Sequence, residues 1–257
     1  MTGTVTANSA ADEAKRRLIV ALDVDSAAKA RQVIADVGDL AGGFKIGMQL
    51  FTAAGPEFVR ELGGRGTRIF LDLKYHDIPN TVASAGVEAA RLGVWMFNMH
   101  AAGGSEMMRR TREEVATACE RDGITRPCMI AVTVLTSSGA AVLGETGINA
   151  EAEDHVVRLA RLAHDAGLDG VVAAPGETKL IRGAIPDADL IIVTPGVRPV
   201  SATLDDQRRV MTPGEAAANG SDYLVVGRPI IESPDMRSAA ASIIAEIGSA
   251  LKPAFES

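Results

Sequence analysis

The sequence has few aromatic residues, few cysteines and no long apolar run. It contains one Trp, two Tyr and six Phe among 257 residues, yet 47% of the chain is hydrophobic, which is enough for a full core. Two cysteines, Cys119 and Cys128, are too few for a disulfide framework or a cysteine-based zinc site, so we expect ordinary thiols in a reducing, cytoplasmic setting. The longest mostly apolar run, 128–135, has about eight residues, far below the ~18–20 that a membrane span requires.

Acidic residues outnumber basic residues, 33 to 26, and the formal net charge is −7. A general nucleic-acid binder would present a basic stripe, so this balance argues against that class but allows a local site for an anionic small molecule. The charged content of 23% and the 26 glycines also argue against a disordered or fibrous chain.

Residues 1–17 lack the apolar stretch of a signal peptide, and we expect them to form a flexible tail.

After residue 17, short apolar runs alternate with longer amphipathic stretches, and no linker divides the chain. Most of the apolar runs are nearly continuous and rich in β-branched residues, as expected of parallel strands buried on both faces: 18–24, 43–48, 68–73, 95–101, 129–135, 170–174, 190–194 and 223–227. Helical patterns between them include 27–37, 80–92, 105–120, 151–166, 177–185, 212–219 and 234–251.

Eight β–α repeats in about 235 residues predict a single (β/α)₈ barrel, a TIM barrel, over residues 18–257. A doubly wound open sheet is the alternative architecture. It would be favoured by a Gly-x-Gly-x-x-Gly turn after the first strand, and residues 22–26 contain no such turn.

Charged residues gather at the carboxyl ends of the predicted strands, where barrel enzymes carry their active sites. Asp72 and Lys74 alternate with apolar neighbours in the third strand, so both should point to the same side, about 7 Å apart along the backbone. Lys45 on the adjacent strand could approach Asp72, and Asp77 follows the strand end. Because buried ion pairs often stabilise a fold no better than apolar packing, this array of alternating charge favours a functional site over a structural ion-pair network.

A second basic group follows the seventh and eighth strands, whose loops commonly hold a phosphate in this fold. Gly227 would let the backbone approach a ligand closely, and Arg228 follows it directly. Arg198 and Gln207 lie on a polar loop, 196–211, that could act as a lid. Arginine suits bidentate phosphate binding, so these residues predict a phosphate site.

The histidines give a weaker signal. His100 closes the fourth strand and could support the site, but a hydrogen-bonded structural histidine is the better interpretation. No spacing of His, Asp and Glu indicates a dedicated metal site, and no Walker-type loop is present.

Taken together, these motifs resemble the orotidine 5′-phosphate decarboxylase family over about residues 18–250. The segments that carry the resemblance are Ala21-Leu22-Asp23, Phe44-Lys45, 72–81, 132–137, 194–199, 206–209 and 226–229. The Asp-x-Lys-x-x-Asp pattern alone is shared with sugar-phosphate enzymes, whereas the full set in this order is highly specific.

The resemblance implies decarboxylation of orotidine 5′-phosphate to UMP and CO₂ in pyrimidine biosynthesis, without a metal or organic cofactor. In this scheme Lys74 protonates the carbon left behind, Asp72 lies beside the departing carboxylate, and Asp23 and Lys45 contact the ribose. A preorganised ammonium would stabilise the carbanion as its charge develops. Acidic neighbours, including Asp77, would orient Lys74 and keep it charged.

The resemblance also implies a role for each remaining candidate. Thr136 would contact the pyrimidine, and the phosphate ligands would be Arg198, Gln207, Gly227 and Arg228. Asp77 and Thr81 would reach the active site of the other subunit, which implies a homodimer.

Two other functions stay open at this point. One is a Mg²⁺-dependent sugar-phosphate decarboxylase or aldolase on the same scaffold, which would share the Asp72, Lys74 and Asp77 motif. The other is a non-catalytic barrel that binds a phosphorylated ligand, although such a protein would not need the alternating charges.

Overall fold

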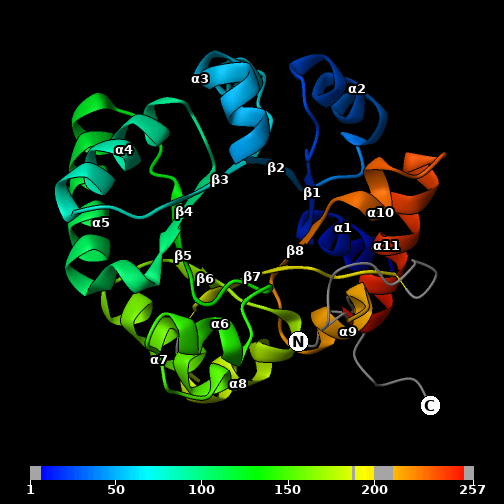
Figure 1. The fold of residues 1–257 in the computed structure, drawn as a ribbon. Coiled ribbons are helices and arrows are strands. Elements are labelled where there is room, and N and C mark those ends of the chain that lie inside the picture. Colours follow the sequence, from blue (N-terminus) through cyan, green and yellow to red (C-terminus); the bar gives the residue numbers. More distant parts are fainter. Residues whose placement is uncertain (1–6, 187–188, 200–210, 252–257) are drawn as a thin grey trace, which may run out of the picture.

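The structure, a computed structural model, describes residues 7–186, 189–199 and 211–251 of the 257-residue chain. Its strands are β1 Leu18–Ala21, β2 Gly43–Gly47, β3 Ile69–Tyr75, β4 Met96–His100, β5 Cys128–Val132, β6 Gly170–Val172, β7 Ile191–Pro195 and β8 Tyr223–Val226. They pair in parallel and in sequence order, and β8 pairs with β1 to close a barrel (Figure 1). This arrangement confirms the predicted (β/α)₈ barrel, and each predicted apolar run overlaps one strand.

The helices surround the barrel (Figure 1). They are α1 Ala7–Arg17, α2 Ala27–Val37, α3 Met48–Gly64, α4 Pro79–Arg91, α5 Gly104–Asp122, α6 Ala140–Glu145, α7 Ala152–Asp165, α8 Thr178–Ala184, α9 Pro213–Ala218, α10 Arg228–Ile231 and α11 Met236–Leu251, with 3₁₀ turns η1 Ala101–Gly103 and η2 Pro175–Glu177. None of the helices in these described ranges is both long and apolar enough to cross a bilayer.

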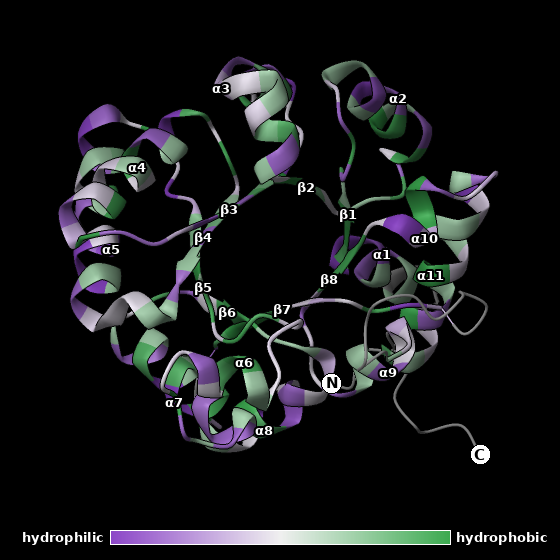
Figure 2. Cartoon of the chain, in the orientation of Figure 1, coloured by the Kyte–Doolittle hydropathy of each residue, from purple (hydrophilic) through white to green (hydrophobic). Residues whose placement is uncertain are grey.

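The strands bury both faces, and the two faces contribute to different parts of the core. Alternate residues such as Ile19 on β1 and Phe70 on β3 form a small cluster inside the barrel. Their neighbours, including Val20 and Leu71, belong to the larger cluster between the strands and the helices. Figure 2 shows strands such as β6 and β7 as mostly hydrophobic, whereas the helices carry hydrophobic and hydrophilic residues on different faces. The period of two in a strand therefore directs one set of residues to the barrel interior and the other to the helix layer.

The expected flexible tail over residues 1–17 is wrong for residues 7–17, which form α1. Ala14 on this helix is completely buried and packs near Gly248 of α11. The Arg17 guanidinium donates a hydrogen bond to the Ser221 carbonyl oxygen at 3.2 Å, and its Nε contacts Glu13. Small residues permit close packing of α1 and α11, a tertiary contact that the polar composition of the segment does not reveal. Residues 1–6 lie outside the described part of the chain.

The predicted helical stretches omit α3. Gly55 interrupts this helix with φ 73° and ψ 177°, and Pro56 follows inside it, so the element is kinked. The N-cap residue, Gly47, also provides no side-chain cap. Glycine and proline are ordinarily signals of a break, and here they separate two helical pieces that pack as one element.

Candidate active site

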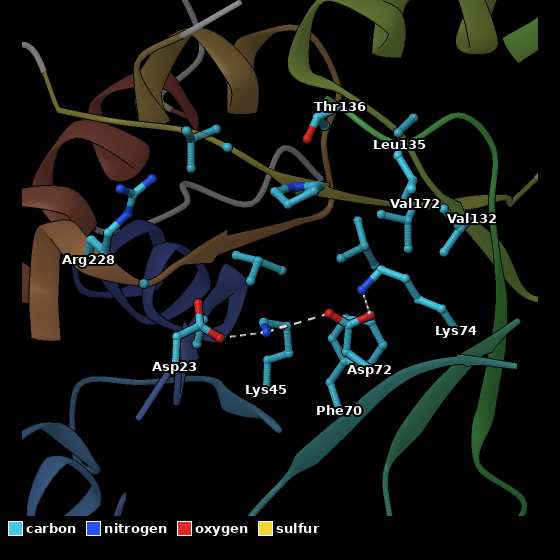
Figure 3. A pocket seen from close by; sticks show the side chains of 18 of the residues that line it. Asp23, Lys45, Phe70, Asp72, Lys74, Val132, Leu135, Thr136, Val172 and Arg228 are labelled. Carbon is cyan, nitrogen blue, oxygen red and sulfur yellow. Dashed lines mark hydrogen bonds and ion pairs between the residues drawn. The ribbon is translucent and has the colours of Figure 1, made fainter. Parts of the chain in front are cut away.

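A cavity of about 280 Å³ opens at the carboxyl ends of the strands. Eight of the eleven residues predicted for the site line it: Asp23, Lys45, Asp72, Lys74, Thr136, Arg198, Gly227 and Arg228. Figure 3 shows Lys74 and Arg228 on opposite sides of this cavity, with Asp23 and Lys45 between them. The cavity therefore brings together residues from β1, β2, β3, β5, β6, β7 and β8 and from the loops that follow several of these strands, as expected for this fold.

Four charged side chains form a continuous chain along one side of the cavity (Figure 3). Lys45 Nζ lies 3.0 Å from Asp23 Oδ1 and 3.5 Å from Asp72 Oδ2. Lys74 Nζ donates to Asp72 Oδ1 at 2.7 Å. The side chains of Lys45 and Asp72 are each only 12% exposed, so these charges interact where solvent screens them weakly.

The pKa of Asp72 results from opposing effects. Burial of the carboxyl group raises the pKa, whereas the charges of Lys45 and Lys74 and hydrogen bonds from Lys74 and Asn98 lower it. The lowering effects prevail, so the pKa lies below its usual value of 3.8. Asp72 is therefore an anion at neutral pH, held between two ammonium groups.

The contact between Lys74 and Asp72 lies within a bulge of β3. Leu71 pairs with Phe97 of β4, but the next pair is Tyr75 with Met99, so three residues of β3 oppose one residue of β4. Within the bulge Lys74 has φ 53°, and it is the one non-glycine residue with positive φ in the described part of the chain. The predicted alternation of side chains is confirmed, since Asp72 and Lys74 line the cavity while Leu71 and Leu73 pack in the cluster between strands and helices. Only the pairing of β3 with β4 is irregular.

Asn98 is a polar residue of the site region that the sequence prediction did not include. Its Nδ2 donates to Asp72 Oδ1 at 2.7 Å, and its Oδ1 accepts a hydrogen bond from the Lys74 backbone N–H at 2.8 Å. It is 1% exposed in the middle of β4. A polar residue in an otherwise apolar strand is the sequence signal that could have identified it, because buried amides require hydrogen-bond partners.

The side of the cavity near β7 and β8 carries the two predicted arginines. Gly227 precedes α10, and a Cβ at this position would lie 3.0 Å from Asp23 Oδ2 and 3.3 Å from Ala21 Cβ. A side chain here would crowd Asp23 and Ala21, so close packing favours glycine at this position. Arg228 begins α10, and Arg198 is buried, with its backbone N–H bonded to the Met211 carbonyl oxygen at 3.0 Å. Gln207 lies outside the described residues.

Apolar side chains cover the remaining wall between these charged groups. The cavity-lining residues Phe70, Val132, Val172, Val193 and Val225 come from five different strands. Leu135 and Thr136 lie at the upper edge in Figure 3. This combination of an apolar surface with a few fixed polar groups is typical of a site for a small organic ligand.

Asp77 and Thr81 do not line the cavity of their own chain. Asp77 Oδ1 accepts a hydrogen bond from the Ile78 backbone N–H at 2.7 Å. Asp77 lies two residues before α4, and Thr81 lies in the first turn of this helix. The adjacent Ile78 is 67% exposed, the highest value among the exposed large apolar side chains of the described residues. The four-charge array within one chain therefore consists of Asp23, Lys45, Asp72 and Lys74, and Asp77 is not a member.

His100 is partly buried beside His76, with ring centroids 5.5 Å apart. Burial and the nearby charges of His76 and Lys74 lower its pKa. The expected hydrogen bond to its ring is not found among the described residues.

The described residues also contain no group of three or more His, Cys, Asp or Glu side chains that could hold a metal ion.

Comparison with known proteins connects this geometry to one family. A model described as "Orotidine 5'-phosphate decarboxylase / HUMPS family" matches residues 16–243. The chain belongs to this family. A protein of Syntrophotalea carbinolica named orotidine 5'-phosphate decarboxylase is 52% identical over 240 residues, covering 93% of this chain and 98% of that protein. The protein of the same name from Geobacter sulfurreducens is 53% identical over 236 residues, covering 92% and 98%.

A solved member of the family has the same barrel. The crystal structure of orotidine 5'-phosphate decarboxylase from Lactobacillus acidophilus aligns with a TM-score of 0.78 at 36% identity, covering 90% of this chain and 99% of that one. The family resemblance inferred from the motifs is thus confirmed.

Proposed function

We propose that this protein decarboxylates orotidine 5′-phosphate to UMP and CO₂ in pyrimidine biosynthesis. The observation that carries the proposal is the chain of charges from Asp23 through Lys45 and Asp72 to Lys74, next to an apolar wall and opposite Arg228. Family membership and about 52% identity to proteins of that name support the same reaction.

The substrate would span the cavity between its two basic sides. Arg198, Arg228, the Gly227 backbone and Gln207 would bind the phosphate, because guanidinium groups bind phosphate with paired hydrogen bonds. Thr136 would contact the pyrimidine ring, which would pack against the apolar wall.

On the other side, Asp23 and Lys45 would contact the ribose, and Lys74 would face the reacting carbon. Loss of CO₂ leaves an electron pair on C6 of the pyrimidine. The Lys74 ammonium would stabilise that charge as it develops and then transfer a proton to the carbon. The anionic Asp72 would lie beside the departing carboxylate and hold Lys74 in position through the 2.7 Å contact. The proposed steps use no metal or organic cofactor.

We further propose a homodimer in which Asp77 and Thr81 reach the partner's site. Both residues lie around the start of α4 and outside their own cavity, near the exposed Ile78. A twofold dimer would bury this apolar side chain and supply a fifth charge to each array. A cytoplasmic location is part of the proposal, because the relatives are enzymes of biosynthesis.

The Mg²⁺-dependent sugar-phosphate reaction is not favoured. The relatives reported above carry the decarboxylase name. In addition, Lys45 contacts both Asp23 and Asp72, so an ammonium occupies the position of a cation that these two carboxylates would share.

The deciding experiment is a spectrophotometric assay of orotidine 5′-phosphate conversion by the purified chain in the presence of EDTA. We expect turnover that survives the chelator and yields UMP and CO₂. Activity that requires added Mg²⁺ would favour the sugar-phosphate alternative. UMP binding without turnover would favour a non-catalytic phosphate-binding barrel, and either result would overturn the proposal.

A further inference from the structure

The backbone around Lys74 departs from a regular strand at one position. Between the pairs Leu71–Phe97 and Tyr75–Met99, β3 has three residues where β4 has one. That single β4 residue is Asn98. An insertion of this kind leaves backbone groups without their ladder partners. The Asn98 side chain replaces one of these partners, because its Oδ1 accepts a hydrogen bond from the Lys74 backbone N–H at 2.8 Å.

The conformation of Lys74 has an energetic cost. A non-glycine residue at positive φ, such as Lys74 at 53°, is disfavoured and persists only where its surroundings hold it. The same Asn98 amide also donates to Asp72 Oδ1, the oxygen that accepts the Lys74 ammonium. One buried side chain therefore contacts the backbone of Lys74 and the carboxylate partner of its ammonium.

We propose that Asn98 is a positioning residue that sets the place of the Lys74 ammonium by holding the β3 bulge and orienting Asp72. The inference rests on the proposed function, in which Lys74 delivers the proton. Asn98 does not line the cavity, so it acts through Lys74 and Asp72 and does not touch the substrate.

The two hydrogen bonds of Asn98 require a side chain that donates to Asp72 and accepts from the Lys74 backbone N–H. A neutral amide does both, whereas an ionised carboxylate can only accept and would repel Asp72. A protonated carboxyl group can again donate and accept. The substitution Asn98→Asp therefore gives a nearly isosteric side chain whose function depends on its protonation.

Other titratable groups near Asn98 must be separated from this effect. They are Asp72 and Lys74 on β3, Lys45 on β2, His100 on β4 and His76 after β3. The wild-type chain and Asn98→Ala contain all of them, so the ratio of each variant's kcat to the wild-type kcat isolates the titration of the new carboxyl group.

The experiment measures kcat and KM for orotidine 5′-phosphate, and Kd for UMP, from pH 5.5 to 8 in wild type, Asn98→Ala and Asn98→Asp. We expect Asn98→Ala to lower kcat by about 30- to 100-fold with Kd for UMP within about threefold, because misplacement of a reacting group by about 1 Å costs about 100-fold. For Asn98→Asp we expect a similar or larger loss at pH 8 and a variant-to-wild-type ratio that rises about tenfold toward pH 5.5. The ratio for Asn98→Ala should stay flat.

A matched control separates positioning from general stability. Thr111 is also fully buried and donates a hydrogen bond to the Met107 carbonyl oxygen on α5, away from the cavity. Thr111→Val should lower the melting temperature and leave kcat within about twofold of wild type. A kcat for Asn98→Ala within threefold of wild type, or a pH-independent ratio for Asn98→Asp, would overturn the inference while leaving the proposed function intact.

A structural readout tests the inference even if the wild-type chain fails to convert orotidine 5′-phosphate, which would count against the proposed function alone. In a crystal structure of Asn98→Ala we expect Lys74 to leave positive φ and its contact with Asp72 to lengthen beyond hydrogen-bond distance. An unchanged bulge with the contact intact would refute the positioning role.

Discussion

Lys74 donates a hydrogen bond to Asp72 at 2.7 Å, although only one residue separates them in β3. Side chains two residues apart on one face of a strand emerge about 7 Å apart, a distance that a lysine side chain can span. Here the contact lies within the bulge, where Lys74 has positive φ. The ammonium is thereby fixed against an anion before any ligand arrives. Such preorganisation is what allows a charge to stabilise a transition state without the cost of reorganising the site.

The first prediction concerns Lys74 itself. Lys74→Ala should remove nearly all turnover of orotidine 5′-phosphate, by about 100-fold or more, because it removes both the stabilising charge and the proton source. UMP binding measured by calorimetry should stay detectable. The control is Lys29→Ala at an exposed position on α2, which should have wild-type activity. Turnover by Lys74→Ala within about tenfold of wild type would reject the proton-donor role.

The second prediction concerns the pH dependence of stability at Asp72. Because its pKa is lower in the folded chain than its usual 3.8, the ionised carboxylate stabilises the fold at neutral pH. This contribution persists down to about pH 4 and is lost as the pH falls through the folded-state pKa. Asp72→Asn should lower the free energy of unfolding at pH 7 by about 1–3 kcal/mol, since it leaves two ammonium groups without their shared anion.

Urea denaturation of wild type and Asp72→Asn from pH 7 to pH 3 measures this difference, which should be largest near neutrality and shrink in acid. Asp12→Asn, at an exposed position on α1, is the control and should differ little from wild type. A difference that is constant across this range would show that ionisation of Asp72 does not stabilise the fold.

The third prediction tests the phosphate side of the cavity. Arg228→Ala should lower kcat/KM for orotidine 5′-phosphate by about 10- to 100-fold, the loss expected for charge-assisted hydrogen bonds. The slow reaction of orotidine, which has no phosphate, should change much less. Arg109→Ala, which removes an exposed arginine on α5, is the control. Equal losses on both substrates would remove Arg228 from the phosphate site.

The fourth prediction tests the shared active site. Asp77→Asn and Lys74→Ala homodimers should both be nearly inactive, but a heterodimer of the two would contain one site with an intact Lys74 and the partner's intact Asp77. Mixing the two variants under exchange conditions should therefore restore activity, up to about half per heterodimer. Absence of recovery in heterodimers verified by mass spectrometry would contradict the shared site.

The fifth prediction concerns the packing of α1. Ala14→Asp should lower the free energy of unfolding by about 3 kcal/mol or more, because it buries an unpaired charge against α11. The same substitution at the exposed Ala11 should cost about 1 kcal/mol or less. Equal effects in thermal and urea unfolding would show that α1 does not contribute to the core.

Much of the fold could be predicted because the strands of this barrel bury both faces. Nearly continuous apolar runs and the helical patterns between them identified all eight strands and most of the long helices. The two errors arose where local composition opposes tertiary packing. Alanine-rich, polar α1 has no strong apolar pattern and is held by close contact with α11, and α3 contains a glycine and a proline that ordinarily end a helix.

The sequence by itself determined most of the residues that meet, because parallel strands of a closed barrel bring their carboxyl ends, and the polar residues there, to one rim. Only the tertiary structure decided how they meet. Lys74 lies in the two-residue excess of β3 over β4, and Asn98, 24 residues away on β4, makes hydrogen bonds with both Lys74 and Asp72. Asp77 and Thr81 are close to Lys74 in sequence but lie outside the cavity. The register of β3 against β4 and the positive φ of Lys74 depend on pairing between strands that are distant in sequence. They cannot be read from the spacing of residues within one strand.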